Sequence, residues 1–65
     1  MRNPNRIYPF CTELAKLWSN WPDLRFGQMM YNISQYVHFE HGKDIFYMED
    51  EELMKILREQ LRGLE

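Results

Sequence analysis

The strongest hydrophobic pattern along the chain lies in residues 22–39 and predicts an amphipathic helix. Apolar side chains recur there every three or four residues. At about 100° per residue they fall within one arc of about 120°. The arc consists of Phe26, Met29, Met30, Ile33, Tyr36 and Val37. Asp23, directly after Pro22, is expected to cap this helix by accepting hydrogen bonds from the free N–H groups of its first turn.

A second apolar face predicts a helix over about residues 9–20. Asn3 and Pro4 predict a turn or short helical piece over residues 1–8, with Asn3 as cap and Pro4 at the first helical position. Pro9 is expected to delay the regular helix, because proline inside a helix lacks an N–H. The connection at 21–23 leaves almost no loop, so the first two helices are expected to pack as neighbours. The apolar face consists of Ile7, Phe10, Leu14, Leu17, Trp18 and Trp21.

The last third of the chain predicts a third helix over about residues 49–62, with Gly63 as its stop. Residues 40–44 are polar and contain a glycine, which predicts a loop. Residues 45–48 are read as an extended lead-in that covers the core, and pairing with a strand of another copy stays open. The fold predicted over residues 1–65 is therefore one compact, all-α three-helix domain with a single core. The apolar arc of the third helix consists of Leu53, Ile56, Leu57, Leu61 and Leu64.

Composition indicates a folded chain, and the distribution of charge bears on whether its partner is a nucleic acid. Hydrophobic residues are 45% and aromatic residues 15% of the sequence, so the chain has enough apolar surface to offset the entropy of ordering it. The aromatic side chains belong either to one core or to a patch that a second subunit covers. Residues 1–39 carry four cations and two acids (+2), and residues 40–65 carry four cations and eight acids (−4). No concentrated basic face results, which argues against nucleic-acid binding.

Cysteine content and hydropathy suggest a location. The one cysteine, Cys11, cannot form an internal disulfide, which fits a reducing compartment. Its place beside an apolar helix face predicts a buried, inert thiol. The N-terminus lacks the apolar run of a signal peptide, and no stretch approaches the roughly 20 apolar residues that cross a membrane. We therefore expect a soluble cytoplasmic protein.

Several blocks of the chain resemble a known family. Arg2-Asn3-Pro4-Asn5-Arg6-Ile7 and Leu17-Trp18 are followed by Pro22-Asp23-Leu24-Arg25-Phe26-Gly27-Gln28 and by Asp44-Ile45-Phe46-Tyr47-Met48-Glu49-Asp50-Glu51-Glu52-Leu53. Together they resemble a family of short uncharacterised bacterial and phage proteins, in which a PDLRxGQ block precedes an FYxED block. The resemblance implies no activity and assigns no functional residue. Pro9 and the long segment 38–43 depart from the family pattern.

Few clusters of residues could bind a metal ion or take part in catalysis, and the sequence signal of each is weak. His38 and His41 share one side of a helix end, where Glu40 or Asp44 would add an oxygen ligand. A solvated helix end explains the histidines better, because His near a C-terminus favours the helix dipole. The acids at 49–52 are explained by the N-terminus of a helix. We predict no catalytic residue, no cofactor and no metal ligand, and hence a protein that is not an enzyme.

A few residues of the second helix stand out as partner contacts. Tyr31 falls outside the apolar arc near Leu24, which predicts a small exposed patch. Arg25 opens the helix, where a cation opposes the dipole, so we expect a partner for it: Asp23, an acid of the third helix, or a ligand. Leu24, Tyr31 and Arg25 are the predicted contacts. We therefore expect a non-catalytic protein–protein interaction module, with a homodimer as one form.

The alternative is a small nucleic-acid-associated regulator of helix-turn-helix type. Three short helices suit that motif. Against it, the third helix, where a recognition helix would lie, opens with four acids that phosphates repel.

Overall fold

A computed structural model describes residues 2–63 and confirms a compact all-α domain of three helices. A 3-10 turn, η1 (Pro4–Arg6), leads directly into α1 (Ile7–Trp18). The second helix is α2 (Phe26–His41), and a second 3-10 turn, η2 (Ile45–Tyr47), leads to α3 (Asp50–Leu61). The described residues contain no strand.

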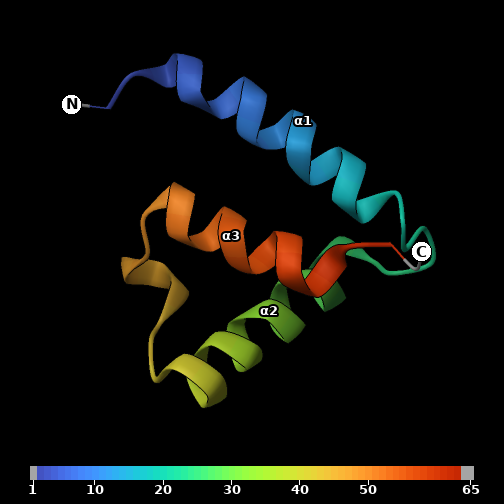
Figure 1. Ribbon diagram of the computed structural model, residues 1–65, viewed down its shortest axis with the longest axis vertical. Coiled ribbons are helices and arrows are strands. Elements are labelled where there is room, and N and C mark those ends of the chain that lie inside the picture. The colour runs from blue at the N-terminus through green and yellow to red at the C-terminus, as the bar shows by residue number, and fades with distance from the viewer. Residues whose placement is uncertain (1, 64–65) are drawn as a thin grey trace.

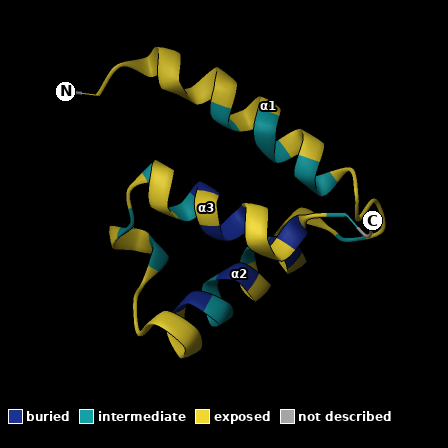
Figure 2. Ribbon diagram, in the orientation of Figure 1, coloured by how far each residue is buried: buried dark blue, intermediate teal, exposed yellow. Residues whose placement is uncertain are grey.

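The helices form three layers with α3 in the middle. Figure 1 shows α1 on one side of α3 and α2 on the other, and α1 packs chiefly against α3 rather than against α2. The expectation that the first two helices are packed neighbours is therefore wrong. The core lies between α2 and α3, whereas α1 contributes no buried residue (Figure 2). The buried side chains are Met29, Ile33, Val37, Met54, Ile56, Leu57 and Leu61.

The segment between α1 and α2 is longer than the sequence suggested and is tied to the end of α3. It spans residues 19–25. The indole N–H of Trp21 donates to the Leu61 carbonyl at 3.0 Å, and the Asn20 side-chain amide donates to the same carbonyl at 3.2 Å. A carbonyl in the last turn of a helix has no partner within the helix. The loop thus satisfies the open end of α3, and this holds α1 against α3.

The beginning of α2 differs from the prediction. The helix starts at Phe26, so Asp23 lies in the preceding turn and does not cap it. Arg25 occupies the capping position, and the Gln28 side chain accepts a hydrogen bond from the Arg25 backbone N–H at 2.9 Å. This is the reciprocal half of a capping box, which satisfies one free backbone donor.

The end of α2 lies two residues beyond the predicted one. The helix continues to His41 and stops at Gly42, whose φ of 64° is left-handed. Glycine adopts this conformation without the steric cost that a Cβ would bring. The predicted loop at 40–44 therefore shortens to the residues after His41.

The first helix begins earlier than predicted. Asn3 caps η1 as expected, because its side chain accepts a hydrogen bond from the Asn5 N–H at 2.9 Å. The regular helix begins at Ile7, two residues before Pro9. Pro9 is tolerated because it lies in the first turn, where a missing N–H costs little.

Residues 45–48 were predicted to be extended, and this is wrong for 45–47, which form η2. The Asp44 side chain accepts a hydrogen bond from the Phe46 N–H at 2.9 Å and so favours the turn. Ile45 and Met48 pack against the core, as the predicted covering role required. At its other end, α3 stops at Leu61 because Arg62 is extended (φ −61°, ψ 146°), so Gly63 is not its left-handed stop. Leu64, predicted to belong to the apolar arc, lies outside the described residues.

Candidate functional site

An open groove of about 930 Å³ runs between the first halves of α1 and α3. Pro9, Phe10 and Met54 give it an apolar lining, and charged side chains surround this lining. Met54 is almost fully buried at 4% exposure, whereas Phe10 is half-buried. Six of the seven charged side chains of the groove form ion pairs across it, and Glu51 forms none among residues 2–63. The seven charged side chains are Arg2, Arg6, Glu13, Glu49, Asp50, Glu51 and Arg58.

Three ion pairs join the N-terminal segment and α1 to the α3 side of the groove. Arg2 pairs with Glu49 at 2.8 Å, and Arg6 pairs with Asp50. Further along, the guanidinium of Arg58 makes two hydrogen bonds to the Glu13 carboxylate, one of them at 2.8 Å. The partners are separated by 47, 44 and 45 residues. A nearly constant separation means that the two segments run parallel and in register.

The Glu13–Arg58 pair shifts the protonation equilibria of both groups. Hydrogen bonds from Arg58 lower the pKa of the Glu13 carboxyl, because they favour its charged form. The hydrogen bond to Glu13 likewise raises the pKa of the Arg58 guanidinium. Both side chains remain charged at neutral pH.

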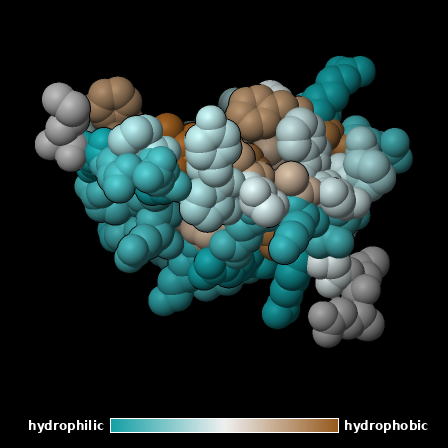
Figure 3. Space-filling view, turned by 90° about the horizontal axis from the view of Figure 1, so that it is seen from above, coloured by the Kyte–Doolittle hydropathy of each residue, from teal (hydrophilic) through white to brown (hydrophobic). Residues whose placement is uncertain are grey.

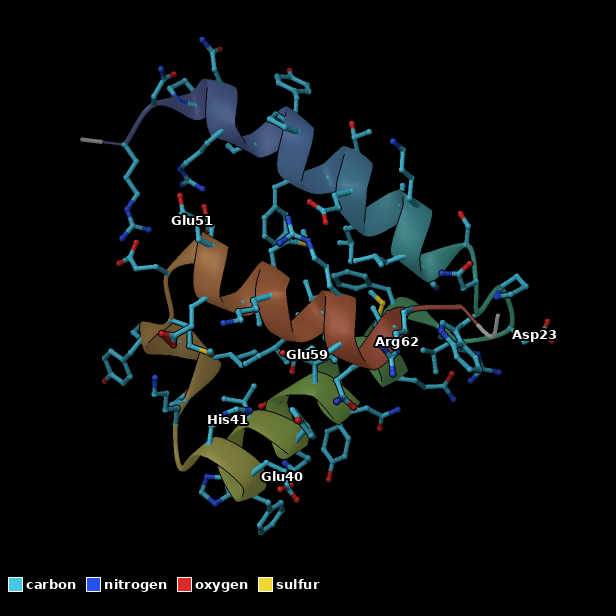
Figure 4. The ribbon with its side chains drawn as sticks, in the orientation of Figure 1. Asp23, Glu40, His41, Glu51, Glu59 and Arg62 are labelled. Atoms are coloured by element: carbon cyan, nitrogen blue, oxygen red, sulfur yellow. The ribbon has the colours of Figure 1, made fainter. Side chains whose placement is uncertain are left out.

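The acids at the start of α3 have a second role that the sequence reading missed. Their place at a helix N-terminus was recognised, but not their partners: Glu49 and Asp50 pair with arginines of the N-terminal segment, and Glu52 pairs with Lys43 at 3.2 Å. Glu51 points toward α1 in Figure 4. The opposite net charges of the two halves of the chain were the sequence signal for these ion pairs, because oppositely charged segments attract each other.

Aromatic side chains form the second notable surface feature. Tyr31 is 65% exposed and Phe39 is 75% exposed. With Gln35 between them they are spaced four residues apart, so all three lie along one side of α2, opposite its buried residues. We call Tyr31, Gln35 and Phe39 the outer stripe. It contains no charged group.

Further apolar side chains reach the surface on other elements. In η2, Phe46 and Tyr47 are 82% and 80% exposed, and their rings meet edge to face with centroids 4.9 Å apart. Figure 3, seen from above α1, shows apolar side chains at the surface on one side and hydrophilic ones covering the other. Aromatic exposure therefore extends beyond the outer stripe.

The three predicted contact residues have different environments. Tyr31 is exposed as expected. Leu24 is half-buried and packs against the core, because it precedes α2 and does not continue its helical face. It borders a hollow of about 300 Å³ beside Trp21 and Leu61. Arg25 is exposed and forms no ion pair with any residue in the range 2–63, so the predicted salt bridge to Asp23 or to α3 is not made there.

The histidines and the cysteine complete the candidate residues. His38 and His41 lie exposed in the last turn of α2, with His38 against the Phe39 ring (4.9 Å) and His41 against the Tyr36 ring (5.5 Å). Glu40 and His41 are at the end of α2 in Figure 4. Among the described residues, no group of three His, Cys, Asp or Glu side chains is arranged to hold a metal ion. Cys11 is a free, exposed thiol, so the prediction of a buried one is wrong.

Comparison with known proteins adds no assignment, since no family model, curated protein or solved structure matches the chain. The resemblance to the PDLRxGQ family stays a prediction. In the described part of the chain, the helices are too short or too polar to cross a membrane.

Proposed function

We propose that this chain is a non-catalytic protein–protein interaction module, with a second copy of itself as the first partner to test. The observation that supports it is the exposure of Tyr31 and Phe39 on the outer stripe. Aromatic side chains are enriched in protein interfaces, because they bury a large rigid area at a small cost in conformational entropy.

The chemistry of the outer stripe favours a protein partner. Its three residues are uncharged, so covering them does not require the removal of water from a charge, which is costly. From residue 31 to residue 39 the stripe is about 12 Å long, given a helical rise of about 1.5 Å per residue. This length matches two turns of a partner helix packed alongside. The neighbouring Arg25, which has no ion pair among the described residues, is retained as a candidate rim contact.

The helix-turn-helix alternative has less support. It requires the cations of the first half of the chain to reach phosphates, and Arg2 and Arg6 are engaged with Glu49 and Asp50. The first turn of α3 carries three acids, which phosphates repel.

We also retain the cytoplasm as the expected location, because an exposed free thiol such as Cys11 fits a reducing compartment. A bacterial or phage source is retained because of the family resemblance.

Light scattering over a concentration series from about 10 μM to 1 mM tests the proposal, because weak dimers dissociate within that range. We expect the mass to rise from the monomer value of 8.1 kDa toward twice that value. The double variant Tyr31→Ser/Phe39→Ser is expected to stay monomeric. Tyr8→Ser is the matched control, since Tyr8 is 78% exposed but lies on α1, and it should dimerise like the unaltered chain.

A monomer at every concentration would remove the homodimer form of the proposal. Cross-linking in a cell extract then tests for a foreign partner. The unaltered chain and Tyr8→Ser should capture the same protein, and the double variant should lose it. Equal capture by all three chains would contradict the outer stripe as a binding surface.

A further inference from the structure

The two ends of α1 are held by contacts of different kinds. At the C-terminal end, the Trp18 indole N–H donates to the Leu24 carbonyl at 2.7 Å, and its ring lies 5.7 Å from that of Phe26. The following residues, Asn20 and Trp21, donate to the carbonyl at the end of α3. These hydrogen bonds are partly buried and involve no charged side chain, so dissolved salt screens them little.

At the N-terminal end the contacts are ionic and exposed. The four side chains of the Arg2–Glu49 and Arg6–Asp50 pairs are between 41% and 71% exposed. Exposed pairs are weak, and salt weakens them further. The main apolar anchor at this end is Phe10, which is half-buried and packs against the core, whereas Ile7 is 45% exposed.

We infer that the first half of α1, residues 7–13, is a salt-sensitive strap that is hinged at the C-terminal end of the helix. When its ion pairs are screened, the strap moves away from α3, takes Phe10 with it and exposes Met54, the buried side chain of the groove lining. Ionic strength thereby controls access to the groove. This inference goes beyond the interaction proposal and does not depend on it, because the outer stripe lies on α2.

Hydrogen exchange followed by mass spectrometry tests the strap at about 0.02, 0.15 and 1 M NaCl, a range in which the screening length falls from tens of ångströms to a few. We expect exchange of residues 7–13 to accelerate with salt by about two- to five-fold for each pair lost. Residues 14–18 and the cores of α2 and α3 should not respond. The variant Arg2→Gln/Arg6→Gln should exchange fast in the strap at low salt and lose most of the salt response, because only the Glu13–Arg58 pair of the strap remains.

The design separates the strap from ordinary fraying of a helix end. Arg6 precedes the N-terminus of α1, where a cation opposes the helix dipole, so its neutralisation alone would slow fraying. Faster exchange in the double variant is therefore attributable to the lost pairs. Arg62→Gln is the matched control. Arg62 follows α3 at the opposite end from the groove and forms no ion pair within residues 2–63 (Figure 4).

Several outcomes would overturn the inference. One is salt-independent exchange of residues 7–13 in the unaltered chain. Another is an equal salt response in the unaltered chain and in the double variant, or an altered response in Arg62→Gln. Acceleration of all three helices together would show global unfolding instead of a hinged strap. If the double variant does not fold, the unaltered chain alone decides, by whether salt accelerates the strap or the whole molecule.

Discussion

Replacement of Leu57 by alanine tests whether the core between α2 and α3 provides most of the stability of the domain. Leu57 lies in α3 with 1% of its surface exposed, among the largest fully buried side chains. Leucine-to-alanine changes at such sites cost about 2.7–5 kcal/mol, because they lose both transfer free energy and packing around a cavity. A domain of fewer than about 70 residues rarely has more than about 3–5 kcal/mol of total stability. We therefore expect Leu57→Ala to be largely unfolded at 25 °C.

The stability loss of Leu14→Ala is the comparison for that of Leu57→Ala. Leu14 faces α3 from α1 but is only half-buried, so truncation removes less apolar area from contact and is expected to cost about 1–2 kcal/mol. That loss corresponds to a fall in Tm of about 4–8 °C per kcal/mol for a small domain. Helix α1 should therefore tolerate a leucine-to-alanine change that unfolds the domain when it is made in the core.

Urea unfolding followed by far-ultraviolet circular dichroism measures both variants, with Gln60→Ala as control. Gln60 is exposed on α3, and a surface change of this kind should stay within about 0.5 kcal/mol. A loss for Leu14→Ala as large as that for Leu57→Ala would refute the layered description, because it would make α1 an equal part of the core. A cooperative transition of Leu57→Ala at the unaltered midpoint would refute it as well.

Two further predictions concern a backbone position and a charge. Gly42→Ala should lower the free energy of unfolding by about 1–2 kcal/mol, measured by thermal unfolding. Because φ is 64° at Gly42 and no atom lies within 4 Å of an added Cβ, the cost is backbone strain alone. Gly27→Ala, inside α2 and equally open, is the control and should not destabilise the domain, so equal losses for the two variants would contradict this reason. Glu13→Gln should destabilise the domain at pH 7 and lose that effect in acid. Hydrogen bonds from Arg58 lower the folded-state pKa of Glu13. The contribution of the pair is therefore fully present above the unfolded pKa of about 4.3 and disappears as the pH falls through the lower folded-state pKa. A difference in Tm between the two chains that is independent of pH would show that the Glu13–Arg58 pair does not link stability to pH.

The candidate site was only partly predictable from sequence. The exposure of Tyr31 followed from its position off the apolar arc, and the structure has it exposed. Leu24 was placed beside it by helical geometry, but the helix starts after Leu24, which instead packs against the core. The groove was missed altogether, since its two sides come from the beginning of the chain and from α3, and the ion pairs that join them link residues 44 to 47 positions apart.

The sequence by itself determined the number of helices and most of the buried faces of α2 and α3, whereas the apolar face predicted for the first helix contains no buried residue. A helical period is a local property, so the apolar arcs around Ile33 and Leu57 identify the two helices that share the core. Helix ends were less well determined, because caps depend on single hydrogen bonds such as that of Gln28 to the Arg25 N–H.

Only the tertiary structure decided that α3 lies between the other two helices. Short connections favoured adjacent first and second helices, yet the indole of Trp21 and three ion pairs join the beginning of the chain to its end. Such contacts form between residues far apart in sequence, and no local pattern records which cation meets which acid. The order of the layers, and with it the groove and its strap, therefore arises from the sum of weak long-range contacts.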